Sequence, residues 1–135
     1  MYYKEAVLCL MFAMAEADGE VDNNELITII TMKNIFTNYD EVSIIALYKS
    51  YQVKFAESSF VEIVGAMLKQ IPAELHMGTL SLLADVAVSD FDVDGQESAS
   101  FSIIANAMNV SDTALKTILL TSLSKKLLID IGKKQ

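Results

Sequence analysis

The sequence predicts an all-α fold, a seven-helix bundle, on three observations. Apolar residues recur at intervals of three and four along most of the chain, which is the spacing of one helix face. The 135 residues include only five glycines and one proline, so few positions interrupt regular structure. No stretch indicates a strand. With 53% hydrophobic residues the chain can bury a sizeable core, and we expect residues 1–135 to form a single domain.

The first predicted helix covers residues 3–17 and is apolar around nearly its whole circumference. Its apolar side chains include Val7, Leu8, Leu10, Met11, Phe12 and Met14. A helix without a polar face is normally buried, so we expect this helix to be the hub of the core. The only cysteine, Cys9, lies inside this run as a small hydrophobe and has no disulfide partner, which suits a reducing cytoplasm.

Six further helices are predicted in order. They cover about residues 23–37, 40–51, 57–70 and 73–88, then run from after Asp94 to about Asn109, and from Ser111 past Leu127. The second helix, over 23–37, is rich in β-branched residues with weak helix propensity, so packing has to hold it. The later helices each carry apolar pairs at helical spacing, which predicts one inward face per helix.

Local chemistry marks several helix ends. Ser58 or Ser59 can cap the 57–70 helix, and Ser111 can cap the last one, because a serine hydroxyl accepts from the exposed amides of a first turn. Pro72 has the backbone angle of a first helical residue, which predicts the start of the 73–88 helix. Asn109 suits the left-handed conformation that often ends a helix.

One acidic stretch occurs twice, over residues 15–25 and again over residues 87–97. Four acids of the first copy, Asp18, Glu20, Asp22 and Glu25, recur 72 residues later as Asp90, Asp92, Asp94 and Glu97. Each copy lies between two apolar runs, so the repeated unit is helix, acidic turn, helix, with repeat units at about 3–37 and 73–109. Two copies are too few for a solenoid, and a pseudo-twofold bundle is the simpler interpretation.

The charge balance excludes one class of partner and leaves another open. The net charge is −8 and every basic residue is a lysine. The chain therefore lacks the guanidinium groups that form bidentate hydrogen bonds with phosphates and guanine. We expect no nucleic-acid partner. Four of the ten lysines lie from Lys125 onward, where they complement the dipole of a helix end; a contact with anionic lipid or an acidic partner is the alternative.

No membrane span or signal peptide is expected. The longest unbroken apolar run, Ala6 to Ala15, has about half of the ~20 residues that cross a bilayer. No basic segment with a cleavage site precedes it.

The two acidic turns are the candidate metal site. Their eight carboxylates are those of Asp18, Glu20, Asp22, Glu25, Asp90, Asp92, Asp94 and Glu97. The second turn opens like a calcium loop, in which alternate carboxylates share one centre. The twelfth position, which needs a glutamate in an EF-hand, is Ile29 in one copy and Phe101 in the other. Neither turn is therefore an EF-hand, and a shorter geometry remains open.

Helix capping is the alternative role for these acids. Asp22 and Asp94 as N-caps, closed by a glutamate three residues later, would each stabilise a helix by about 1 kcal/mol without metal. Capping leaves the other four acids unexplained, and clustered carboxylates repel one another unless solvent or a cation relieves them. We expect a divalent cation with oxygen ligands, Ca²⁺ before Mg²⁺ or Mn²⁺.

The doubled pattern, an apolar helix followed by Ala-x-Ala-Asp-Gly-x-Val-Asp-x-x-Glu, resembles the TerB family of tellurite-resistance proteins and the TerB-like domain of membrane-anchored DnaJ-type co-chaperones. The resemblance covers about residues 3–123. The first turn fits closely, whereas the second has Ser89 for alanine and Phe91 for glycine. The resemblance implies a TerB-like bundle whose acidic turns converge on a metal-binding surface. It also implies a cytoplasmic protein of tellurite and chemical stress, peripheral to the inner face of the membrane beside a TerC-type partner.

Three functional hypotheses remain. We favour a non-enzymatic, cation-binding stress-response protein that acts through protein contacts. The first alternative is an acidic interaction module that needs no metal, and the second is a metal-dependent phosphate-ester hydrolase. The hydrolase is disfavoured because His76 is the only histidine and no arginine is present. Of the seven methionines, five lie on apolar helix faces and are interpreted as core filling: Met11, Met14, Met32, Met67 and Met108.

Overall fold

The computed structural model describes residues 2–18, 36, 39–90 and 99–134, and the statements below concern those residues. They form six α-helices and one short 3-10 helix. In chain order these are α1 (Tyr3–Asp18), α3 (Glu41–Lys54), α4 (Phe60–Leu68), η1 (Ala73–Leu75), α5 (His76–Asp90), α6 (Ala99–Ala107) and α7 (Asp112–Lys133). No strand occurs among the described residues, so the predicted all-α class is confirmed. The helix predicted over 23–37 lies outside them, except for Phe36.

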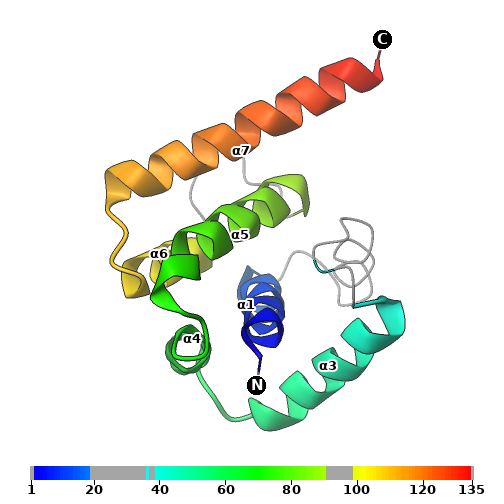
Figure 1. Cartoon of the computed structure of the whole chain (residues 1–135), viewed down its shortest axis with the longest axis vertical. Coiled ribbons are helices and arrows are strands. Elements are labelled where there is room, and N and C mark those ends of the chain that lie inside the picture. Colours follow the sequence, from blue (N-terminus) through cyan, green and yellow to red (C-terminus); the bar gives the residue numbers. More distant parts are fainter. Residues whose placement is uncertain (1, 19–35, 37–38, 91–98, 135) are drawn as a thin grey trace.

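Helix α1 is the centre of the molecule. In Figure 1 it is seen nearly end-on, with α3, α4, α5 and α6 around it, and it contacts all four of them. Every residue from Ala6 to Ala15 is at most 3% exposed. The absence of a polar face on this helix explains this burial, because solvent on any side would wet apolar surface. The prediction of a buried hub helix is confirmed.

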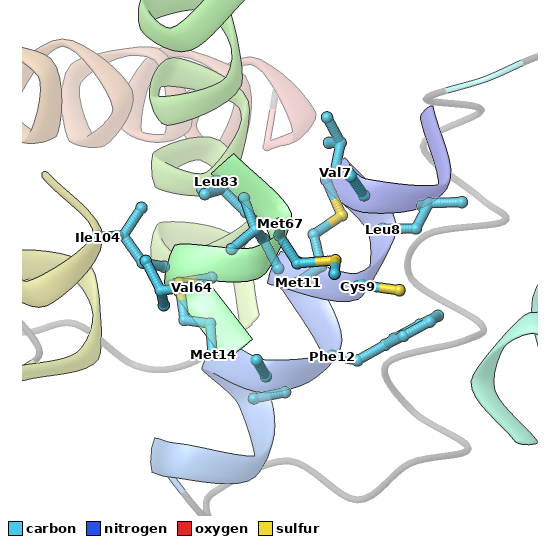
Figure 2. Close-up of a cluster of buried hydrophobic side chains, with 14 of the residues drawn as sticks. Val7, Leu8, Cys9, Met11, Phe12, Met14, Val64, Met67, Leu83 and Ile104 are labelled. Carbon is cyan, nitrogen blue, oxygen red and sulfur yellow. The ribbon is translucent and has the colours of Figure 1, made fainter. Parts of the chain in front are cut away.

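Methionine and branched side chains from four helices fill the space beside α1. Figure 2 shows Met11 and Met14 of α1 meeting Val64 and Met67 of α4, with Leu83 of α5 and Ile104 of α6 close to them. The side chains that form this cluster are all buried. Among the described residues, the interpretation of the helix-face methionines as core filling is confirmed for Met11, Met14 and Met67; Met108 is partly buried against the same core.

Helix ends follow the local chemistry in most cases. Ser59 caps α4 in a reciprocal box with Glu62, so of the two candidate serines it is the second that caps, and α4 starts at Phe60 instead of residue 57. Ser111 caps α7 through the Ala114 amide, as predicted. Asn109 has φ of 61°, the left-handed conformation expected there. Asp40 caps α3 by accepting from the Ser43 amide at 2.8 Å, although residue 40 was predicted to be helical.

Pro72 differs from its predicted role. Its ψ of 142° places it before a helix, not inside one, and it is followed by the 3-10 turn η1. The α-helical bonding of α5 begins only at His76. A proline fixes φ but leaves ψ free, which is why the sequence located the break and misplaced the first helical residue.

Helix α7 packs along α5 on the side of the molecule away from α3 (Figure 1). Leu115, Leu119 and Ser122 form its buried face. From Ser124 to Lys134 every residue is exposed, and we call these eleven residues the α7 tail. The helix extends to Lys133, in agreement with the predicted continuation past Leu127.

Candidate functional site

Two of the eight predicted metal ligands fall on described backbone, and both end a helix. Asp18 is the last residue of α1, and Asp90 is the last residue of α5. The other six, and the side-chain positions of these two, lie outside the described residues. Within the part of the chain that the structure describes, no group of three or more histidine, cysteine or acidic residues is arranged to hold a metal ion.

The two acidic turns begin at corresponding points of two helices that touch. Asp18 and Asp90 occupy equivalent positions in the sequence repeat, and α1 contacts α5. A helix C-terminus already carries a partial negative charge, so an aspartate there is unfavourable unless a cation is nearby. Neither helix has a basic residue in its last turn. Both helix ends therefore combine a dipole and a carboxylate of the same sign.

The last turn of α1 is fastened to α3 by a carboxylate with two tyrosine donors. The Tyr48 hydroxyl donates to Glu16 Oε1 at 2.7 Å, and the Tyr51 hydroxyl donates to Oε2 at 3.3 Å. Phe12 stacks on the Tyr48 ring with centroids 4.8 Å apart. Both tyrosines are buried and Glu16 is exposed, so the carboxylate reaches back over the edge of the core. This arrangement, the Glu16–tyrosine clamp, lies two residues before Asp18.

Sequence reasoning missed the clamp, although a signal for it exists. Tyr48 and Tyr51 are three residues apart and therefore lie on one face of α3. Two buried hydroxyls on one face require an acceptor, and Glu16 is the acid that closes the apolar run of α1. Burial first, and the Glu16 carboxylate second, raises the pKa of Tyr51, so its hydroxyl stays a neutral donor.

A second carboxylate joins α5 to α7. Asp85 Oδ1 accepts from the Ser122 hydroxyl at 2.7 Å and lies 3.0 Å from Lys125 Nζ. Asp85 is five residues before Asp90, so this contact holds the last turns of α5 against α7. Lys125 is half-exposed, and a solvent-exposed ion pair of this kind contributes little to the free energy of unfolding.

The remaining reactive side chains have structural surroundings. His76 Nε2 lies 2.9 Å from the carbonyl oxygen of Ile71, so this ring nitrogen forms a hydrogen bond across the turn between α4 and α5. Burial, with a smaller contribution from Glu5, raises the pKa of the Cys9 thiol to about 12, which keeps it protonated and unreactive at neutral pH. Neither residue is paired with a partner that would make it a catalytic acid, base or nucleophile among the residues described.

One apolar pocket of about 160 Å³ opens between the first turns of α1 and α5. Its lining includes Tyr3, Val7, Phe36, Leu75 and Leu82. The Thr79 hydroxyl beside it donates to the Leu75 carbonyl at 2.8 Å and so offers the pocket no free polar group. A pocket with this lining suits an apolar side chain and carries no chemistry of its own.

Comparison with known families gives one match. The family model described as "Tellurite resistance protein TerB" matches residues 4–120. The comparisons with curated proteins and with solved structures found no match. Over the helices that the structure describes, none combines the length and the apolar character needed to cross a bilayer.

Proposed function

This chain belongs to the TerB family of tellurite resistance proteins, and we propose that it is a non-enzymatic stress-response protein that binds divalent cations through its two acidic turns. Binding of the cation would serve contacts with other proteins. We further propose that residues 1–135 form a single domain with repeat units at about 3–37 and 73–109. The tellurite-resistance role follows from the family, whereas the cation and the protein contacts are our proposal.

The observation that carries the cation proposal is the charge at the ends of α1 and α5. Each helix adds an aspartate to the negative end of its dipole, without a basic residue in the last turn. Each then leads into three more acids of its turn, which contains no lysine. Such a concentration of negative charge raises the free energy of the folded chain unless a counter-charge is present. A bound cation provides that counter-charge at both ends.

The proposed ligands are Asp18, Glu20, Asp22 and Glu25 in the first turn, and Asp90, Asp92, Asp94 and Glu97 in the second. All are carboxylates, which favour the hard cations Ca²⁺, Mg²⁺ and Mn²⁺ over metals that prefer nitrogen or sulfur. Ca²⁺ is our first choice because it accepts irregular ligand sets, whereas Mg²⁺ requires a near-ideal octahedron.

Two features support a non-enzymatic role. Hydrolysis of phosphate esters needs a base or a cationic group near the metal. The chain has no arginine, and its one histidine lies at the start of α5, at the other end of the helix from Asp90. We therefore propose that the protein works by recruitment of a protein partner, at the cytoplasmic face of a membrane and with a TerC-type membrane protein as the candidate.

A calcium titration tests the proposal directly. The full chain, stripped with EDTA, is titrated with CaCl₂ by calorimetry and melted with and without the ion. At 100 times the Kd, a bound ion adds about 2.7 kcal/mol to the free energy of unfolding. The variants Asp18→Asn and Asp90→Asn should each weaken binding. Glu57→Gln is the matched control, because it removes an exposed carboxylate from the loop before α4.

The titration also separates the alternatives. If millimolar Ca²⁺, Mg²⁺ or Mn²⁺ produced no heat and no change in melting temperature, the cation proposal would fail. The metal-free acidic interaction module would then be the favoured function. Turnover of a phosphate ester by the metal-loaded wild type, lost in Asp18→Asn, would instead support the hydrolase. Equal loss of calcium binding in Glu57→Gln would show that the measured binding is non-specific charge attraction.

A further inference from the structure

The α7 tail is a stretch of exposed helix that the Lys125–Asp85 ion pair ties to α5 at its first turn. From Ser124 to Lys134 all residues are exposed, and in Figure 1 the C-terminal end of α7 points away from the other helices. A polar tail would need no explanation. This tail exposes Leu127 by 61%, Leu128 by 74%, Ile129 by 56% and Ile131 by 49%, and Leu120, two turns before Leu127, by 62%. The match to the TerB family ends at residue 120, before the tail begins.

These apolar side chains lie on the face of α7 that points away from α5. Leu120, Leu127 and Ile131 follow one another at seven and four residues, which places them on one line along the helix, with Leu128 beside it. The face packed on α5 belongs to Leu115, Leu119 and Ser122, which are out of phase with that line. The exposed line is therefore a second apolar face, not the continuation of the core-facing one.

Charge is segregated onto the same tail. It contains four lysines and one aspartate, which give it a net charge of +3. Because the whole chain has a net charge of −8, the rest of the chain carries −11. Lys126 and Lys133 are seven residues apart on the side of α7 opposite to the apolar line, and Ile129 lies between them as the one exposed apolar residue of that side. An apolar stripe with lysines on the other face is the pattern of a helix that lies in a membrane interface.

We propose that the α7 tail docks on an anionic lipid surface, with Leu120, Leu127, Leu128 and Ile131 inserted at the headgroup level and the lysines against the lipid phosphates. Charge complementarity favours this occupant over a second copy of the tail. A second copy of the tail would bring +3 against +3, and an antiparallel pair would place lysines beside lysines. A bilayer accepts the apolar line and neutralises the lysines at the same time, while the −11 body stays on the water side.

Vesicle binding tests this inference in EDTA, so that the result does not depend on cation binding by the turns. The full chain is mixed with vesicles containing about 30% phosphatidylglycerol, or with vesicles of phosphatidylcholine alone, and bound protein is measured by flotation. We expect binding to the anionic vesicles, weakened by salt, and little binding to the neutral ones. Equal binding to both, or to neither, would overturn the proposal.

Two pairs of variants separate the tail from general surface effects. Lys126→Gln with Lys133→Gln should lower the partition coefficient about fivefold per lysine, whereas Lys49→Gln with Lys69→Gln removes the same charge elsewhere and should not. Leu127→Gln with Ile131→Gln should lower it at least about tenfold. The control is Val42→Gln with Val53→Gln, which also replaces two exposed apolar side chains by glutamine, but on α3. These valines are 74% and 82% exposed, so their replacement should disturb the fold little.

The controls also define failure. Equal losses in the tail variants and in their matched controls would show that the tail is not the contact. Light scattering of the free protein addresses the second-copy alternative: a dimer that becomes a monomer on Leu127→Gln with Ile131→Gln would assign the apolar line to a second chain and overturn the lipid assignment.

Discussion

Removal of the Tyr48 hydroxyl tests whether the Glu16–tyrosine clamp holds the end of α1. Tyr48→Phe deletes the 2.7 Å bond to Glu16 but keeps the ring that stacks on Phe12. A hydrogen bond to a carboxylate contributes about 1.5–3 kcal/mol when well buried. Because Glu16 is exposed, we expect a loss at or below the lower limit of this range, about 1–1.5 kcal/mol in the free energy of unfolding.

The second tyrosine supplies the comparison. The Tyr51 bond is longer, at 3.3 Å, so Tyr51→Phe should cost less than Tyr48→Phe. Urea denaturation gives both values, and for a chain of this size 1 kcal/mol corresponds to a shift of about 4 °C in melting temperature. A double-mutant cycle of Tyr48→Phe with Glu16→Gln measures the coupling between the two side chains.

Two results would refute the reasoning. A larger cost for Tyr51→Phe than for Tyr48→Phe would mean that bond length does not set the strength of the clamp. A coupling energy near zero between Glu16 and Tyr48 would mean that the carboxylate and the hydroxyl act independently, and that the last turn of α1 is held by ring packing alone.

Three further predictions follow from the structure. The free energy of unfolding should fall between pH 9 and pH 12, because the folded Cys9 thiol has a pKa of about 12 and the unfolded thiol releases its proton near 9, and Cys9→Ala should flatten that decline in urea melts taken at each pH. Ser59→Ala removes the α4 cap and should cost about 1 kcal/mol by urea denaturation, with Ser58→Ala close to neutral as its control. Asp18→Ala should abolish calcium binding with little loss of stability in the metal-free protein, whereas Asp22→Ala should also cost about 1 kcal/mol; equal stability losses from both would favour capping alone.

The parts of the fold that the sequence predicted are those set by neighbouring residues. An unbroken apolar circumference sufficed for the burial of α1, and a serine before an apolar run sufficed for the caps at Ser59 and Ser111. Asn109 was recognised by its tolerance of positive φ. Each of these depends on a few residues and on bonds within one or two turns, so no knowledge of the tertiary arrangement is needed.

The parts that the sequence did not predict depend on contacts between distant segments. The Glu16–tyrosine clamp joins residues 32 and 35 positions apart. The Asp85 contacts with α7 join residues 37 and 40 positions apart. Of the candidate site, only the positions of Asp18 and Asp90 at the helix ends can be compared, and the ligand roles stay predictions.

The burial of α1 on every side has a consequence for how the protein comes apart. Because α3, α4, α5 and α6 all touch this helix, the departure of any one of them would wet a strip of Leu, Met and Phe side chains. Partial unfolding is thereby penalised at each step, and the described helices should melt as one cooperative unit. Amide protons in the middle of α1 would then exchange with solvent only when the whole bundle opens. Asp18 thus ends a helix whose central amides should be among the slowest to exchange in the described part of the chain.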